Sequence, residues 1–149
     1  GADGLAVFRR NLVSTIERMR TQQYNGSSAP QIVMFSPIAH ENLHSPHLPD
    51  GSENNARLYA YSQAMKEVCD QQQVVYVDLF DATQKLYESS AAPLTMNGIH
   101  LLEHGNRAVA EVVCQQLFGR LPSADGATLE ELRQAVLEQN GYYVCGGRC

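Results

Sequence analysis

Two short apolar runs, residues 31–35 and 74–80, constrain the fold more than any other feature of the sequence. Both are rich in apolar and β-branched residues without the alternation of a half-exposed strand, a pattern typical of strands buried on both faces. Such strands belong to parallel sheets covered by helices, and the segment between the runs has the periodicity of a crossover helix. The sequence therefore predicts a fold of the α/β class.

Helical periodicity accounts for most of the remaining chain. Apolar residues recur at three- and four-residue steps in five segments, which predicts helices over 3–23, 54–72, 82–88, 103–118 and from Thr128 onward. Thr128 and Glu131 fit a capping box at the start of the last helix. Helices and strands alternate along the chain as in a doubly wound domain.

Two strands are few for a domain with this many helices. Sheets usually carry about four to six strands, and two strands cannot cover the apolar faces of four helices. The pattern is that of a partial three-layer, doubly wound, flavodoxin-like domain whose N-terminal strands are missing. We expect this domain to span residues 1–120, with a trailing helix and a Cys/Gly tail over 121–149. Exposed apolar helix faces predict self-association of such a domain.

Composition argues against several classes of function. Charged residues make up 18% of the 149 residues, the net charge is -5 and the basic residues are not clustered, so nucleic acid is not an expected partner. No apolar run approaches the roughly 18 residues that a membrane span requires. Cys69 and Cys114 lie in helical patterns, where buried hydrophobic roles are expected. Cys145 and Cys149 permit a small disulfide loop but lack the second pair of a structural zinc site.

Chemically useful residues gather where the predicted strands end. In an open parallel sheet, ligands bind beyond the carboxyl ends of the strands. The segments that carry Ser36, His40, Glu41 and His100 leave from that edge or return to it. A histidine there can act as a general base, because its ordinary pKa of about 6.5 lies close to working pH. The alternative is a loop histidine that only hydrogen-bonds to the backbone.

A complete catalytic triad within the chain is a further alternative. Ser36, Asp78 and His100 are of the right types and would face the same edge of the sheet. However, Pro37 follows the serine, forces an extended backbone and removes an amide that could serve an oxyanion hole. The strained elbow that exposes a nucleophilic serine is therefore not expected, and substrate binding is the role predicted for Ser36.

Residues 40–47 suggest a metal site, because three imidazoles and a carboxylate occur within this stretch. The spacing is not that of a helical pair that presents two ligands on one face, and Pro46 interrupts it. We favour a polar loop in which His40 and Glu41 face the substrate, with no metal or other cofactor. A metal-binding interaction domain is the alternative.

The most specific signal surrounds His100. The segment 94–101, followed by a predicted helix, resembles the last conserved block of the SGNH/GDSL hydrolases, where Asp-x-x-His precedes the C-terminal helix. Segments 35–37 and 75–79 fall where that family has its two final strands. The resemblance covers about residues 5–118, and the chain is similar to a bacterial branch that attaches such a module to large haem-binding proteins.

The resemblance implies a serine-type hydrolase of carboxylic esters. In that family a serine from an early Gly-Asp-Ser block attacks the ester, and the histidine, here His100, takes the serine proton and returns it to the leaving alcohol. The block with the serine would precede Gly1, so the chain alone is expected to be inactive. The implied substrates are small-molecule or carbohydrate esters, and the implied location is secreted or periplasmic.

One position departs from the family pattern. Asn97 stands where the family usually has the aspartate that supports the histidine. An amide can accept a hydrogen bond from the imidazole but brings no charge. Three alternatives follow: Glu41 or Glu103 supports His100, His100 works with weaker support from Asn97, or the module no longer catalyses and binds a ligand or partner instead.

Overall fold

The computed structural model describes residues 2–120 and 125–145. The chain divides into two compact units, Gly1–Gly119 and Arg120–Cys149. The first unit holds both strands and four helices, and the second holds helix α5 (Gly126–Cys145). Within the described residues, none of the helices is both long and apolar enough to span a membrane.

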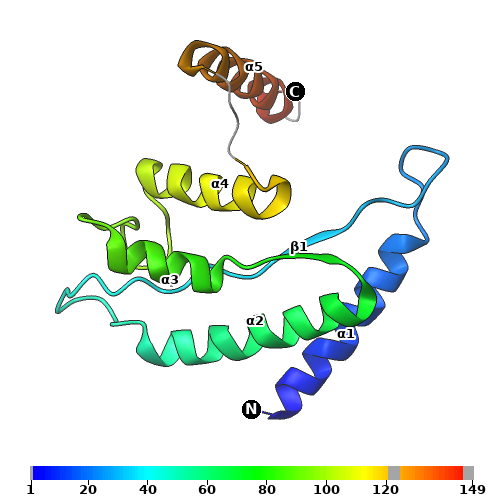
Figure 1. The fold of residues 1–149 in the computed structure, drawn as a ribbon, viewed down its shortest axis with the longest axis horizontal. Helices are drawn as coiled ribbons and strands as arrows, with labels where there is room; N and C mark the ends of the chain where they lie inside the picture. The colour runs from blue at the N-terminus through cyan, green and yellow to red at the C-terminus, as the bar shows by residue number, and fades with distance from the viewer. Residues whose placement is uncertain (1, 121–124, 146–149) are drawn as a thin grey trace. The chain divides into compact units, whose positions relative to one another are not determined.

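The first unit is built around a parallel pair of strands, β1 (Val33–Phe35) and β2 (Val75–Val77). Val33 lies opposite Val75, and Phe35 lies opposite Val77. Helix α2 (Ser52–Gln72) makes the crossover between the two strands (Figure 1). The predicted α/β fold with two parallel strands is confirmed.

The helices lie on both sides of the strands. Helices α1 (Ala2–Arg20) and α2 lie on one side, and α4 (Glu103–Phe118) lies on the other (Figure 1). α3 (Phe80–Ser89) begins three residues after β2. The buried core forms between α1, α2 and the start of β2, and its members are Leu12, Ile16, Val68, Cys69 and Val74. The predicted helix ranges are confirmed to within a few residues.

The strands are not buried on both faces, and this part of the prediction is wrong. The side chains of Phe35 and Val75 are 41% and 53% exposed, whereas Val77 is fully buried. In the described part of the chain no further strand pairs with β1 or β2, and the helices that contact β2 most are α2 and α4. Cys114 on α4 is only partly buried rather than buried as predicted, and the same holds for the other apolar residues on that face of the helix: Val109, Val112, Val113 and Leu117.

Helix α5 begins earlier than the sequence pattern predicts. Asp125 caps it, since its carboxylate accepts a hydrogen bond of 2.8 Å from the Thr128 amide. This bond lowers the pKa of Asp125. The capping box predicted at Thr128 is therefore wrong, because the aspartate three residues earlier takes the capping role. The predicted loop between Cys145 and Cys149 extends outside the described residues.

Candidate functional site

Ser36 is a buried helix cap. It follows β1, and its hydroxyl oxygen accepts hydrogen bonds from the amides of Leu79 and Phe80, at 2.8 and 2.9 Å. These amides start α3, where the helix supplies no internal acceptors for them. The hydroxyl therefore fixes the start of α3 against the end of β1. Its predicted role in substrate binding stays a prediction.

The loop after Ser36 runs along α3 and is tied to it. The Ala39 amide donates to the Thr83 hydroxyl at 2.9 Å, and the Tyr87 hydroxyl donates to the Ala39 carbonyl at 3.1 Å. Burial raises the pKa of Tyr87 to about 12. The phenol is thus neutral at working pH and acts as a donor. This attachment delivers the next two residues, His40 and Glu41, to the candidate site.

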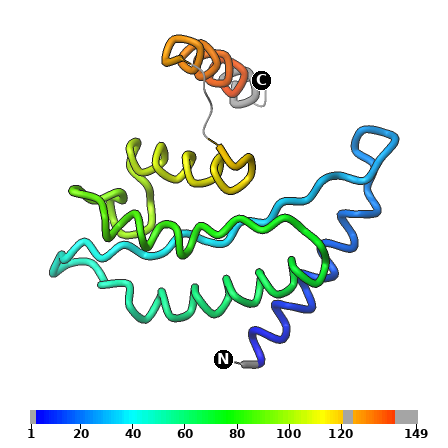
Figure 2. Tube along the Cα trace, viewed as in Figure 1, coloured from blue at the N-terminus to red at the C-terminus, as the bar shows by residue number. Residues whose placement is uncertain are grey.

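The segment between α3 and α4 folds into a tight hairpin-like turn. Thr95 and Leu101 form an antiparallel bridge, and the Met96 amide donates to the His100 carbonyl at 2.9 Å. Gly98 lies in the turn with φ +92°, a conformation that side chains with Cβ rarely adopt. Figure 2 shows the chain between β1 and α2 passing close to this segment, where the Glu41 amide donates to the Gly98 carbonyl.

His100 and Asn97 meet within this turn. The Asn97 side-chain oxygen accepts from the His100 amide at 3.1 Å and from the Ile99 amide at 3.3 Å. The same oxygen lies 3.0 Å from His100 Nδ1. Because this atom is an oxygen that already accepts from two backbone amides, a hydrogen bond between it and the imidazole requires the tautomer with the proton on Nδ1. The His100 side chain is exposed.

Glu41 is a buried carboxylate bound to the same turn. Its oxygens accept from the Leu94 amide at 3.0 and 3.1 Å, from the Thr95 amide at 2.7 Å and from the Thr95 hydroxyl at 2.6 Å. The Thr95 hydroxyl in turn accepts from the Gly98 amide at 2.9 Å. Within the described interactions neither Glu41 nor Glu103 bonds to the His100 ring. Glu41 thus contacts the backbone of the turn that carries His100, and not the imidazole itself.

His40 fills the space between two glycines. Its backbone amide and carbonyl both pair with the Asn55 side chain, at 2.7 and 2.8 Å. A Cβ at Gly51 would lie 2.7 Å from the His40 ring, and one at Gly98 would lie 2.4 Å from its Nε2. Both glycines have positive φ, so the ring packs against bare backbone on each side. His40 Nε2 is buried, and it has no hydrogen-bond partner within the described part of the chain.

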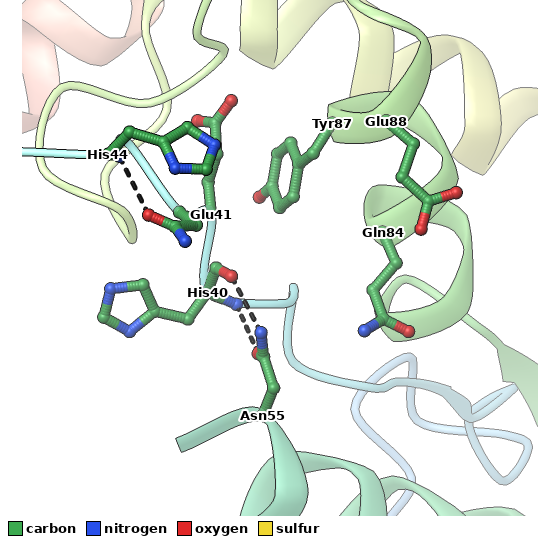
Figure 3. A pocket seen from close by; sticks show the side chains of 8 residues that line it. His40, Glu41, His44, Asn55, Gln84, Tyr87 and Glu88 are labelled. Atoms are coloured by element: carbon green, nitrogen blue, oxygen red, sulfur yellow. Dashed lines mark hydrogen bonds between the residues drawn. The ribbon is translucent and has the colours of Figure 1, made fainter. Parts of the chain in front are cut away.

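A pocket of about 280 Å³ opens beside this loop. Its lining from the loop includes His40, Glu41 and His44, and Asn55 adds a contribution from α2. Its other wall comes from α3, which contributes Gln84, Tyr87 and Glu88, and the Tyr87 ring points toward the loop (Figure 3). The lining is rich in amide, carboxylate and imidazole groups. His100 is not among the residues that line this pocket.

The alternative arrangements do not assemble in the described residues. Asp78 accepts a hydrogen bond from the Asp81 amide at 3.0 Å, and Ser36 accepts from α3, so neither bonds to His100 there. Across residues 2–120 and 125–145, no three His, Cys, Asp or Glu side chains lie close enough together to hold a metal ion. In the described residues, the members of the alternative triad are therefore not joined by hydrogen bonds to His100, and the metal-binding alternative has no cluster of ligands.

Sequence reasoning missed Thr95 and Gly98 as parts of the site. A threonine three residues before a glycine can accept a hydrogen bond from the glycine amide, and this local signal was present. The bond between Thr95 and Glu41 joins positions 54 apart, and nothing in either segment marks it. Tyr87 was missed because a tyrosine on a short helix is more often a packing residue.

The elements of the first unit define a domain of the α/β class. A similar solved structure is LAE5, an alpha/beta hydrolase enzyme from the metagenome of Lake Arreo, Spain, with a TM-score of 0.53 and 17% identity. The match covers 75% of this chain and 46% of that chain, so this chain spans less than half of the neighbour's length. The likeness establishes the fold alone. No family model and no curated protein matches the chain.

Proposed function

We propose that this chain supplies the histidine of a serine-type ester hydrolase, with His100 as general base and general acid. The observation that carries the proposal is the contact between Asn97 Oδ1 and His100 Nδ1 at 3.0 Å. A hydrogen bond at Nδ1 fixes the tautomer that leaves Nε2 free to accept a proton, which is the arrangement that activates a serine in this chemistry.

The nucleophile in this proposal comes from a segment outside the chain. Ser36 is 3% exposed and its hydroxyl already accepts two amides, which makes it a poor nucleophile. The hydrolase of similar fold has more than twice the matched length, which leaves room for the residues that would complete such a site. In the complete site, the His100 ring would take the serine proton during attack on the ester carbonyl and return it to the leaving alcohol.

Small-molecule or carbohydrate esters are the substrates we propose. The pocket beside α3 supports this choice, because amide and carboxylate groups there can bind hydroxyl groups of a ligand. His40 and Glu41 line that pocket, and their contact with substrate is part of the proposal. Their fixed hydrogen bonds to Asn55 and Thr95 would make the contact a rigid one.

Hydrolysis of p-nitrophenyl acetate by the complete gene product that contains this chain tests the proposal. His100→Ala should lower kcat/KM by about 10²–10⁴-fold, the range for loss of a general base. The matched control is His104→Ala, which removes a neighbouring exposed histidine whose ring bonds to the Pro93 carbonyl. Equal turnover in the His100 and His104 variants would refute the proposal.

A non-catalytic binding module is the second candidate function. Two observations favour it: Asn97 brings no charge to the imidazole, and the described pocket does not include His100. Asn97→Asp separates the two candidates, because an aspartate should raise turnover in an esterase, as the reverse change in serine proteases lowers it about 10⁴-fold. A folded protein with no His100-dependent turnover on a panel of acyl esters, before and after this change, would favour the binding module.

A further inference from the structure

The carboxylate of Glu41 is buried, and within residues 2–120 and 125–145 the hydrogen bonds it accepts come from one short segment. Only 6% of the residue is exposed. It accepts from two backbone amides and one hydroxyl, all of them at Leu94 and Thr95. Charge-assisted bonds of this kind are shorter and stronger than neutral ones, and a buried carboxylate needs them. The carboxylate therefore fixes the first residues of the turn that carries His100.

The Thr95 hydroxyl links the Glu41 carboxylate to Gly98 at the tip of the turn. It donates to Glu41 at 2.6 Å and accepts from the Gly98 amide at 2.9 Å, so one oxygen joins the carboxylate to the tip. The Glu41 backbone amide also donates directly to the Gly98 carbonyl at 2.9 Å. Asn97 and His100 flank this fixed point in the chain. Their side chains meet at 3.0 Å across the turn that contains Gly98.

We propose that Glu41 is a positioning residue for His100, acting through the Thr95 hydroxyl and the Gly98 amide rather than by contact with the imidazole. This inference rests on the proposed function, in which the His100 tautomer decides whether Nε2 can accept a proton. Glu41 and Thr95 hold the turn so that Asn97 Oδ1 meets Nδ1. Displacement of a supporting group can lower a rate far more than its distance from the chemistry suggests.

The test compares Thr95→Val with Thr95→Ser. Valine keeps the shape of threonine but removes the hydroxyl, whereas serine keeps the hydroxyl. Thr15→Val is the matched control, because within the described part of the chain the Thr15 hydroxyl bonds to the Asn11 carbonyl of its own helix, α1, and to no other element. Glu41→Gln is a second variant, since its amide cannot accept at both positions as the carboxylate does. Long-range ¹H–¹⁵N spectra of the imidazoles report the His100 tautomer in the folded chain, without any substrate.

In the unchanged chain, the Nδ1–H form of His100 should dominate. Thr95→Val and Glu41→Gln should remove that majority and speed hydrogen exchange at the Gly98 amide, while Thr95→Ser and Thr15→Val should preserve both. In the complete gene product, Thr95→Val should lower kcat with little change in KM. A purely structural role would lower stability and leave the tautomer of the folded protein unchanged.

The positioning role of Glu41 and the proposed esterase function can each be refuted without the other. If Thr95→Val frees the Gly98 amide but leaves the His100 tautomer and kcat as they were, the positioning role is refuted even though His100→Ala abolishes turnover. If Thr95→Val changes the tautomer and no ester turnover depends on His100, the positioning role stands and the esterase function falls. The spectra and the turnover assay therefore answer different questions.

Discussion

Replacement of Gly98 by alanine should destabilise the protein more than the same replacement at a glycine that also has a positive φ but has open surroundings. The Gly98 φ of +92° disfavours any residue with a Cβ. The new Cβ would also lie 2.4 Å from His40 Nε2 and 3.0 Å from the Glu41 carbonyl oxygen. The His40 ring cannot retreat freely, because the Gly51 backbone lies against it and Asn55 holds its main chain.

The expected loss of stability has two parts. Backbone strain at a left-handed position costs about 1–2 kcal/mol, and forcing a methyl group into a packed contact costs about 1–3 kcal/mol. Together they predict a decrease of about 2–5 kcal/mol in the free energy of unfolding. Gly119→Ala is the matched control, because Gly119 has φ +67° and, among the described residues, no neighbouring atom lies within 4 Å of the added Cβ. Only the strain of about 1–2 kcal/mol should appear there.

Urea denaturation followed by circular dichroism measures the free energy of unfolding of both variants. The midpoints of the transitions are compared where that free energy has the same dependence on urea concentration in both variants. A double-mutant cycle with His40→Ala isolates the steric part, because removing the ring should relieve about 1–3 kcal/mol of the Gly98→Ala effect. Equal destabilisation by Gly98→Ala and Gly119→Ala, with no coupling to His40, would show that the ring does not pack on Gly98 and would refute the reasoning.

Three further predictions concern single groups. Ser36→Ala should destabilise the first unit by about 1–2 kcal/mol in urea denaturation, as expected for a lost helix cap, while Ser89→Ala on the exposed end of α3 should have little effect. Tyr87 should ionise near pH 12 in an ultraviolet titration, a step that Tyr87→Phe removes. Its preference for the neutral form stabilises the fold below pH 10 and is lost between about pH 10 and 12. Asp125→Ala should lower the helical content of α5, and the same loss should occur in the unchanged chain as pH falls through the lowered pKa of Asp125. A pH-independent helical signal would contradict that prediction.

The elements of the fold were predictable because they depend on local pattern. Apolar residues at helical spacing place α2 and α4 within a few residues of their observed bounds. The exposure of Phe35 and Val75 was not predictable, because β-branched and aromatic residues have the same local preference whether or not another layer covers them. The start of α5 was missed because Asp125 and Thr128 are both good capping residues.

In the candidate site, too, local contacts were predictable from the sequence and long-range contacts were not. The meeting of Asn97 and His100 is local, over three residues, and the family resemblance pointed to it. The role of Glu41 depends on a bond to Thr95 across 54 positions, which no periodicity or spacing reveals. Sequence reasoning gave Glu41 contact with substrate or support of His100, and neither role anticipates a carboxylate buried against Leu94 and Thr95.

The short sheet makes the loop contacts more important than they would be in a larger one. β1 and β2 contribute three residues each, so the sheet fixes little beyond the direction in which the two loops leave it. Precision at His100 must then come from the loops themselves. Ser36 fixes the start of α3, Tyr87 fixes the loop that carries Glu41, and Glu41 fixes the turn of His100. Each step is a hydrogen bond to backbone, and under the proposed positioning role these buried polar groups, rather than the strands, set the position of the imidazole.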